Sequence, residues 1–596
     1  MKSKLSWLIL SSLIALSLVL VSCSTKTAST TKPTTTQTTK PITTPTTAPT
    51  TKPTTTTTGK WWDKFGVPQY GGTLTFRRVS DPGYFDMWYR DNTTGSIRRL
   101  WLEELITWNW TTDPSLWEFK TNSAPDEYKK GLLAENWEMP DAQTVIFHLR
   151  KGITYQNKPP MNGREFVASD VVYHFERLIG IGTFAGKGSP FATADETTAA
   201  LQSITAPDKY TVVVKWKYPS LDIITNLSDS GLLLRYFTPK EVVDMGVAND
   251  WHYAIGTGPW ILDDYVSGSS SSFSRNPNYW KYDDRYPQNK LPYADSLKVL
   301  IIPDNATALA ALRTGKIDEL EDVTPQQAKS LAQSNPQLVQ TSRPLGGPSL
   351  ELRCDVKPFT DIKVRTALQM AIDLDTIAKT YYGGVVDGSP CGLINPLYKL
   401  DVTPYAAWPQ QLKDEYAYNT TAAKKLLADA GYPSGFKTNI VIPAVQDTDL
   451  MQIVKSYFAD IGVDMEIRVM DTTAFNAFIA AWKHDQISAR STGGTGMAYS
   501  GYRALVRRYS TGQSNYTRNN DKTYDGMVDR YATSIDIVER RKIINEAGLY
   551  LLSQHWAVQM LPTVNFCISQ PWFKGFNGEF PVDYAKFWVD QSVKGH

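Results

Sequence analysis

The residues that could carry out hydrolysis are present in this chain, but not in the patterns that such chemistry requires. The six histidines stand far apart, at positions 148, 174, 252, 484, 555 and 596. The chain has no Gly-x-Ser-x-Gly elbow, no His-Glu-x-x-His pair and no phosphate-binding loop. Adjacent acids occur at Glu103-Glu104 and Asp263-Asp264; paired acids can hydrolyse glycosides, but neighbouring acids usually mark a solvated surface. The sequence therefore predicts no catalytic residue and no enzyme, with an exported hydrolase as the weaker alternative.

Arginine and tryptophan side chains are the first candidates for binding rather than catalysis. Arg353 and Arg490 are candidates because a guanidinium can hold a carboxylate with two hydrogen bonds. Trp108 belongs to a group of tryptophans whose flat rings can stack on a sugar or an aromatic ligand. Salt bridges for the arginines and core packing for the tryptophan are the alternatives.

The N-terminus has the order of a secretory signal. Lys2 and Lys4 precede an apolar run from Leu5 to Val21, and Ser22-Cys23 follows it. The residues Leu20-Val21-Ser22-Cys23 resemble the bacterial lipoprotein signal, in which the cysteine is lipidated and becomes the mature N-terminus. We expect residues 1–23 to be this signal and Cys23 to anchor an exported protein to the outer face of the cytoplasmic membrane; an ordinary cleaved signal is the alternative.

Residues 24–60 predict a disordered linker. They contain 20 threonines, five prolines, five lysines and no aromatic residue. Such a segment cannot bury enough apolar surface to repay the entropy lost on ordering. The linker would hold the folded part away from the membrane.

The remaining cysteines do not indicate a metal site. Cys354, Cys391 and Cys567 allow at most one disulfide, and the sequence does not choose the pair. No two cysteines have the spacing of a zinc finger. We therefore expect neither a metal nor a cofactor.

The composition describes a large folded body that is mildly acidic. The chain has 596 residues, room for roughly four folding units of about 150 residues each. Lys and Arg total 62 and Asp and Glu 60; the first 60 residues hold seven of the lysines and no acid, which leaves 55 basic against 60 acidic residues and a net charge of −5. This balance excludes the basic surface expected of a nucleic-acid-binding protein.

Strand and helix patterns interleave along the folded part. Apolar alternation predicts strands at 70–76, 144–149 and 210–216. Helical spacing predicts helices at 168–178, 361–382, 421–430 and 539–552, the second of them capped by Thr360 or Asp361 and ended by Gly383-Gly384. The order has no fixed period, which favours an α/β fold with more than one lobe over a repeat architecture.

Several phrases along the chain resemble the family 5 extracellular solute-binding proteins, the receptors of ABC importers for peptides, nickel and some oligosaccharides. In chain order the phrases are Gly131-Leu132-Leu133-Ala134-Glu135-Asn136-Trp137, Phe147-His148-Leu149-Arg150-Lys151-Gly152, Phe166-Val167-Ala168-Ser169-Asp170-Val171, Ile255-Gly256-Thr257-Gly258-Pro259-Trp260, Arg275-Asn276-Pro277-Asn278-Tyr279-Trp280, Leu312-Arg313-Thr314-Gly315-Lys316-Ile317-Asp318, Pro358-Phe359-Thr360-Asp361 and Ala423 to Tyr432. The resemblance spans roughly residues 70 to 575.

The resemblance implies an α/β, two-lobed fold of the periplasmic-binding-protein type, with mixed sheets, a hinge and an inserted domain. Lobe one would comprise 61–105, 203–340 and 558–596, the insertion 106–202 and lobe two 341–557. A ligand enclosed between the lobes would stabilise the closed form, which the permease recognises.

The resemblance also implies where the ligand would lie. Ser80 and Asp81 follow the first strand, where family members line the cleft. Peptide-binding members place an acid in lobe two against the ligand's α-amino group, but here no acid lies between Asp485 and Asp521. That segment instead supplies Thr492, Gly493, Gly494 and Tyr499 as candidate ligand-binding residues. Its glycines give room for a bulkier group.

The sequence therefore predicts a lipid-anchored, monomeric solute-binding protein with an ABC permease and an organic solute, peptide-like or oligosaccharide, as its partners. A receptor that passes its ligand to a membrane sensor is the alternative. The sequence does not identify the ligand.

Overall fold

The computed structural model describes residues 59–89, 95–120, 124–187, 201–221, 223–228, 236–390, 392, 394, 397–491, 501–512, 514–579 and 582–593. The predicted signal, Cys23 and all of the predicted linker except Gly59 and Lys60 lie outside these residues. Within the described ranges, no helix has both the length and the apolar character needed to cross a membrane. Cys354 and Cys567 carry free thiols, and Cys391 lies outside the described residues.

A seven-stranded mixed sheet forms the centre of what we call the first body. Its strand order is β14 (Val339–Leu345), β20 (Thr563–Ser569), β13 (Glu319–Val323), β1 (Thr73–Arg78), β12 (Ser296–Ile301), β9 (Ser270–Arg275) and β8 (Trp260–Val266). Leu320 and Val323 pack on one face with helices α6 (Asn305–Arg313) and α7 (Pro325–Ser334). Leu74 and Phe76 point to the other face, where Phe573 and Tyr584 of the C-terminal segment cover them.

An antiparallel four-stranded sheet joins the same core. Its order is β4 (Ala134–Asp141), β5 (Thr144–Leu149), β7 (Thr211–Trp216) and β6 (Leu201–Asp208). Alternate residues of β5 are buried, and α2 (Ala168–Ile179) packs against β6 and β7. His174 of α2 is a core residue whose ring lies 5.0 Å from that of Phe237.

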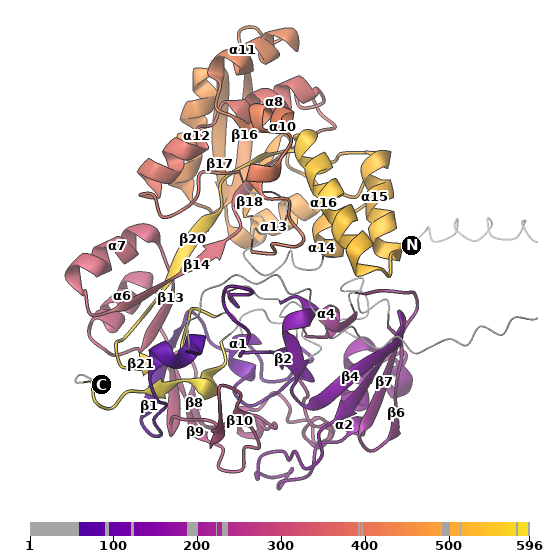
Figure 1. Ribbon diagram of the computed structural model, residues 1–596, viewed down its shortest axis with the longest axis vertical. Coiled ribbons are helices and arrows are strands. Elements are labelled where there is room, and N and C mark those ends of the chain that lie inside the picture. The colour runs from indigo at the N-terminus through magenta and orange to yellow at the C-terminus, as the bar shows by residue number, and fades with distance from the viewer. Residues whose placement is uncertain are drawn as a thin grey trace, which may run out of the picture. The chain divides into compact units, whose positions relative to one another are not determined.

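A five-stranded sheet forms the centre of the second body. Its order is β17 (Val463–Met470), β16 (Phe436–Pro443), β18 (Ile487–Ser491), β15 (Pro348–Leu352) and β19 (Ala557–Gln559). The helices of this body are α8 (Ile362–Met370), α9 (Leu374–Thr376), α10 (Gln410–Tyr416), α11 (Thr420–Asp429), α12 (Thr448–Asp460), α13 (Thr472–Ala480), α14 (Gly501–Val506), α15 (Lys522–Thr533) and α16 (Ile537–Ser553). In Figure 1, α14, α15 and α16 form a group to one side of this sheet.

Short elements complete the chain. The helices are α1 (Gly95–Arg98), α4 (Ile223–Ser228) and α5 (Lys240–Asp244), and the strand pairs are β2 (Ile106–Trp108) with β3 (Lys129–Gly131), β10 (Tyr282–Asp283) with β11 (Tyr286–Lys290), and β21 (Phe573–Lys574) with β22 (Trp588–Val589). Single turns of 3-10 helix occur at Trp61–Phe65, Asp126–Tyr128, Gly182–Phe184, Trp251–Tyr253, Tyr405–Ala407 and Tyr584–Lys586, and a turn of π-helix at Ile377–Tyr381.

The chain passes between the two bodies along two neighbouring segments. The first leads from β14 into β15, and the second leads from β19 into β20; Figure 1 shows β14 and β20 running up toward the second body. Leu345 pairs with Thr563, and the Met560 amide donates a hydrogen bond to the Pro348 carbonyl oxygen at 3.2 Å. Two crossings held side by side make a hinge rather than a loose tether.

The predicted mixed α/β architecture is confirmed, and most predicted elements lie within two or three residues of the observed ones. The helix predicted over 361–382 is wrong in its middle, because α8 ends at Met370 and a new helix begins at Leu374. Asp373 caps that second helix by accepting a hydrogen bond from the Thr376 amide. The Asp373 carboxylate therefore starts a new helix, although apolar residues at helical spacing continue past it.

Gly256 and Gly258 serve a close packing contact rather than a simple turn. A β-carbon at Gly256 would lie 1.9 Å from the Trp101 carbonyl oxygen, and the Gly258 amide donates to that oxygen at 2.9 Å. Glycine is therefore required here by the approach of two backbones.

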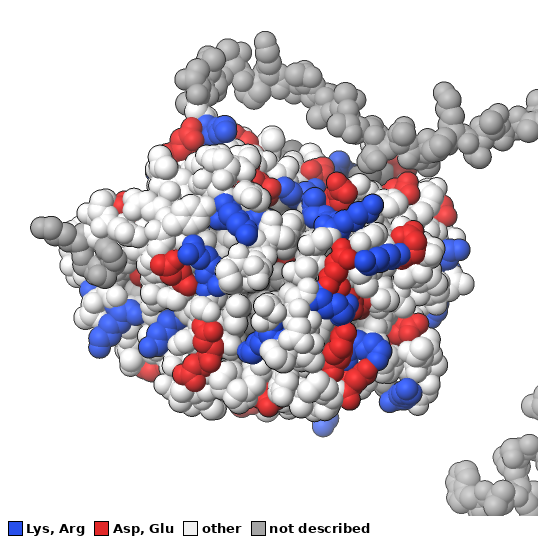
Figure 2. All heavy atoms as spheres, turned by 90° about the horizontal axis from the view of Figure 1, so that it is seen from below, with Lys and Arg blue, Asp and Glu red and all other residues white. Residues whose placement is uncertain are grey.

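Charges are mixed on the surface seen in Figure 2. Lysine and arginine side chains alternate with aspartate and glutamate over that face, and neither sign forms a broad patch. Such a face lacks the continuous basic surface by which proteins bind nucleic-acid backbones.

Candidate ligand-binding site

Strand directions place the loop after β1 on the side of the first sheet that faces the second body. Strand β1 runs parallel to β12 and β13, and β14 runs parallel to β13 because both are antiparallel to β20. The end of β14 leads into the second body. The ends of β1, β12 and β13 therefore lie at the same edge as the hinge.

The same reasoning places the end of β18 at the facing edge of the second sheet. Pro348, the first residue after the crossing, pairs with Ser491 at the end of β18, and Ser349 pairs with Arg490. The backbone of Arg490 thus lies next to the hinge. Thr492, Gly493, Gly494 and Tyr499 follow directly and lie outside the described residues.

The loop of residues 79–89 is attached to the first body at both ends. Asp81, one of the predicted site residues, accepts hydrogen bonds from the Ser267 hydroxyl at 2.7 Å and the Gly268 amide at 2.5 Å. Asp86 forms a buried ion pair with Arg177 at 2.6 Å. Ser80 lies exposed directly before the first of these two anchors. These contacts attach the loop to the rest of the first body. The Asp81 carboxylate also binds the turn between β8 and β9.

A charged cluster lies on the C-terminal-segment face of the first sheet, toward its hinge edge. Arg78, the last residue of β1, contacts the Tyr584 hydroxyl. Glu321 of β13 forms an ion pair with Arg343 of β14 at 3.4 Å. Glu319 is buried, and its Oε1 atom accepts no hydrogen bond from the described residues. We call these five residues the hinge-edge cluster.

The protonation states of the hinge-edge cluster follow from burial and from its neighbouring charges. Burial, with the charge of Glu321 as a further cause, raises the pKa of Glu319 well above its usual value. Burial lowers the pKa of Arg78, but Tyr584, Glu321 and Glu319 raise it by more, so the guanidinium stays charged. Burial raises the pKa of Tyr584 to about 12. Glu319 is therefore a poor partner for a ligand ammonium group, because it resists ionisation.

Trp108 lies in a buried aromatic cluster rather than on an open surface. Its ring lies 5.4 Å from that of Trp110 and stacks on Phe119 at 5.6 Å. The cluster reaches the second body, because the ring of Trp117 lies 5.1 Å from that of Tyr398 in that body. Trp108 thus packs within the aromatic cluster that joins the two bodies, and it is not an open stacking surface for a ligand.

Two polar contacts accompany this aromatic contact. Arg541 of α16 forms an ion pair with Glu127 at 3.0 Å, and Lys399 donates to the Ser115 carbonyl oxygen at 3.3 Å. Both join the segment between β2 and β3 to the second body. The bodies therefore touch on one side through residues 115–127.

Arg353 is engaged within the second body. Its guanidinium pairs with Asp355 at 2.7 and 2.8 Å and donates to the carbonyl oxygens of Trp482 and His484. Asp485 begins the approach to β18 at the end remote from the hinge, where it accepts a hydrogen bond from Asn439 at 3.1 Å. Neither side chain is placed to meet a ligand at the facing edges.

The sequence reasoning did not single out the hinge-edge cluster. The acids of β13 follow the phrase ending in Asp318, and acids in a short strand look like an exposed strand face. The sequence did contain one signal for the cluster: Glu319 and Glu321 alternate with Leu320, which places both acids on the same face of the strand. Among the described residues, no group of three histidine, cysteine or acidic side chains is placed to hold a metal ion.

Comparison with known families gives one match that covers most of the chain. The model described as "Bacterial extracellular solute-binding proteins, family 5 Middle" matches residues 129–513. This range contains the four-stranded sheet, five strands of the first body and most of the second body.

Individual proteins agree with this match. Heme-binding protein A of Haemophilus influenzae is 26% identical over 490 residues, which cover 78% of this chain and 85% of that protein. The periplasmic oligopeptide-binding protein OppA of the same organism is 24% identical over 481 residues, covering 76% of this chain and 83% of that protein. The solved structure of the periplasmic binding protein DppA from Helicobacter pylori, in complex with the peptide STSA, has a TM-score of 0.67 and 22% identity, and covers 88% of this chain and 99% of its own. That likeness confirms the predicted fold.

Proposed function

Because the chain belongs to the bacterial extracellular solute-binding proteins of family 5, we propose that it captures an organic solute between its two bodies and delivers it to an ABC permease. The family consists of binding proteins, so the chain binds its solute and does not convert it. The observation that carries the proposal is the strand direction described above. It brings loops of both sheets to edges that face each other across a two-segment hinge.

Capture works through the hinge equilibrium. A solute that contacts the 79–89 loop on one side and the end of β18 on the other makes both sets of contacts only in the closed form. Binding therefore shifts the population toward closure by the difference in affinity between the two forms. The proposed lobes are residues 61–105, 203–340 and 558–596 for lobe one, with 106–202 inserted, and 341–557 for lobe two.

The solute we propose is peptide-like or an oligosaccharide, and it does not depend on a free ammonium group. Relatives named for heme, oligopeptide and dipeptide binding support an organic solute of some size. No acid lies between Asp485 and Asp521; in the hinge-edge cluster the pKa of Glu319 is raised, and Glu321 is already paired with Arg343. An ammonium buried without a carboxylate partner would be costly. Peptides with a blocked N-terminus therefore fit better than free ones.

The remaining parts of the proposal concern location. We propose that Cys23 is lipidated, that residues 24–60 form the linker and that the protein acts as a monomer on the outer face of the cytoplasmic membrane. The basic start, the apolar run and the Leu-Val-Ser-Cys sequence support the anchor. Metabolic labelling with a fatty acid tests it: wild-type protein should incorporate label, and a Cys23→Ala variant should not.

Native mass spectrometry of the purified protein tests the function. We expect a bound organic molecule that survives gentle purification and is released on denaturation. Calorimetry with that molecule should then give a saturable, single-site isotherm. Recovery of a chemically altered molecule after incubation would contradict the proposal.

A further inference from the structure

A separate cavity of about 70 Å³ lies inside the first body and the residues next to it. Its lining comes from three stretches, residues 99–132, 236–281 and 582–585, and none of the described lining residues belongs to the second body. A water molecule needs roughly 10–15 Å³ measured in this way. The cavity therefore holds about five waters, or one molecule of a few heavy atoms, and it is too small for a peptide or an oligosaccharide.

Three of the residues that line this cavity carry a hydrogen-bond donor without a partner. The Trp260 indole is fully buried, and the Trp110 indole is 6% exposed. Their Nε1 atoms, and the Nε atom of Arg99, find no acceptor among the described residues. All three residues line the cavity. A buried donor without a partner costs about as much as a lost hydrogen bond, so three at one cavity indicate a missing acceptor.

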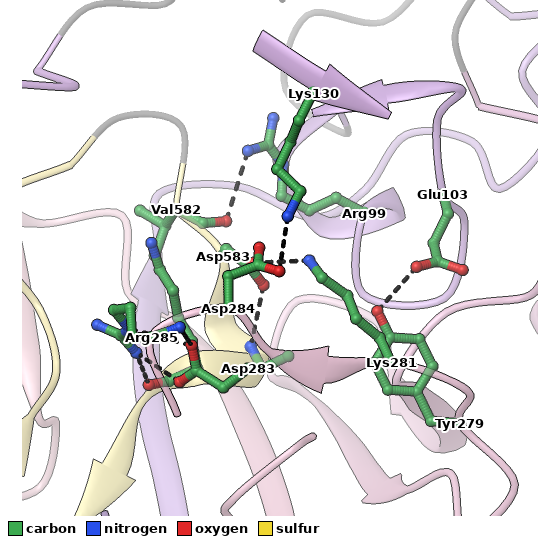
Figure 3. Close-up of polar contacts among 12 residues, drawn as sticks. Arg99, Glu103, Lys130, Tyr279, Lys281, Asp283, Asp284, Arg285, Val582 and Asp583 are labelled. Carbon is green, nitrogen blue, oxygen red and sulfur yellow. Dashed lines mark hydrogen bonds and ion pairs between the residues drawn. The ribbon is translucent and has the colours of Figure 1, made fainter. Parts of the chain in front are cut away.

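Figure 3 shows two of the three carboxylates that line the cavity, Glu103 and Asp583, beside their polar partners. Glu103 accepts hydrogen bonds from the Tyr279 hydroxyl at 2.8 Å and from the Trp280 indole at 3.0 Å. Asp583 accepts from the Ala585 amide and faces the Lys281 ammonium group at 3.9 Å. Glu104 completes the acidic part of the lining.

Lys281 supplies a positive charge at the same place. Its side chain is 9% exposed, and 3.9 Å from the Asp583 carboxylate is longer than a hydrogen bond. Burial lowers the pKa of Lys281, but Asp583, Asp284 and Glu103 raise it by more, so the ammonium group stays charged. The lining of the cavity thus combines the charged Lys281 and three donors without an acceptor with the carboxylates of Glu103, Glu104 and Asp583.

We propose that this cavity binds a small organic carboxylate. Its oxygens would accept hydrogen bonds from the Trp110 and Trp260 indoles and from Arg99, and its charge would face Lys281. The site is independent of the proposed solute capture, since all of its described lining residues belong to the first body.

Nuclear magnetic resonance of ¹⁵N-tryptophan-labelled protein tests the proposal, with sodium acetate as the probe. The indole N–H signals of Trp110 and Trp260, assigned by Phe substitution, should move and saturate with acetate. They should not respond to sodium chloride at equal ionic strength or to methylammonium chloride. The Trp62 signal should stay fixed, because its Nε1 atom is also buried without a partner but lies away from the cavity.

Variants give the matched comparison. Trp260→Phe and Trp110→Phe each remove one donor and keep an aromatic ring, and each should weaken acetate binding about fivefold. Trp62→Phe should leave acetate affinity unchanged. Arg99→Lys removes the Nε donor while keeping the charge, and it provides the test if an indole variant does not fold. Signals that do not saturate, an equal response of Trp62, or a response to methylammonium would overturn the proposal. Loss of solute capture alone would not affect it.

Discussion

Gly347 and Leu561 lie so close that a β-carbon at Gly347 would stand 2.3 Å from the Leu561 carbonyl oxygen. The two residues belong to the two segments that cross between the bodies. No side chain fits between these backbones, so the pair fixes how the two crossings lie against each other. The close contact between the two hinge segments thus requires glycine at position 347.

Gly347→Ala should disturb the hinge. Forcing a methyl group into a packed site costs about 1–3 kcal/mol, so we expect the free energy of unfolding to fall by that amount and ligand affinity to change with it. Gly548→Ala is the matched control, because a β-carbon there meets nothing within 4 Å in the middle of α16. The control should be neutral or up to about 1 kcal/mol more stable. Calorimetric unfolding of both variants makes the comparison, and equal behaviour would contradict the packing argument.

Glu127 and Arg541 should favour the closed form modestly. They pair across the bodies at 3.0 Å with side chains 42% and 30% exposed, so solvent screens the pair and we expect a coupling below about 1 kcal/mol. A double-mutant cycle with Glu127→Gln and Arg541→Gln, read out as solute affinity, measures it. Glu546→Gln removes the Arg530 pair, which lies wholly within the second body, and should leave affinity unchanged. A coupling free energy of zero between Glu127 and Arg541 would show that their ion pair does not contribute to closure.

Glu319 should make stability depend on pH. Its pKa is raised above the ordinary 4.5, so between 4.5 and the folded value the folded state holds a proton that the unfolded state has lost. The free energy of unfolding should therefore fall as pH rises through that window. Glu319→Gln should flatten this slope, whereas Glu135→Gln on an exposed part of β4 should not. Urea unfolding at a series of pH values provides the measurement, and an unchanged slope in Glu319→Gln would refute the assignment.

Blocking the N-terminus of a peptide ligand should cost little affinity. Neither the 486–520 segment nor Glu319 offers an ionised carboxylate to an ammonium group. We expect the N-acetylated form of a peptide to bind at least as tightly as the free form, because no ionised carboxylate offsets the cost of burying the ammonium group. Paired calorimetric titrations of the two forms decide the point. If acetylation lowers the affinity 100-fold or more, a carboxylate elsewhere in the protein pairs with the amine, and this prediction is wrong.

Periodic patterns predicted the helices and strands well, because an element that buries one face carries apolar residues at regular spacing along a short stretch of sequence. The helix at α2 and the strand at β5 follow directly from apolar spacing within a dozen residues. The break at Asp373 escaped the same reasoning, because a single capping carboxylate decides it within an otherwise continuous apolar stripe.

The candidate site was less accessible to sequence reasoning, because it depends on pairings between distant parts of the chain. Arg490 reaches the hinge edge only because β18 pairs with β15, which lies far before it in the sequence. Glu321 and Arg343 form their ion pair across β20, a strand from near the C-terminus that lies between their two strands. For Arg353 the sequence offers either a ligand carboxylate or a salt bridge, and the structure shows a salt bridge with Asp355, two residues further on.

Small-angle X-ray scattering of the protein with and without the molecule that copurifies with it tests the central claim most directly. Closure around a solute predicts a smaller radius of gyration in its presence, with the molecule recovered chemically unchanged. Superimposable scattering curves at saturating solute, or recovery of a transformed molecule, would contradict capture by two closing bodies.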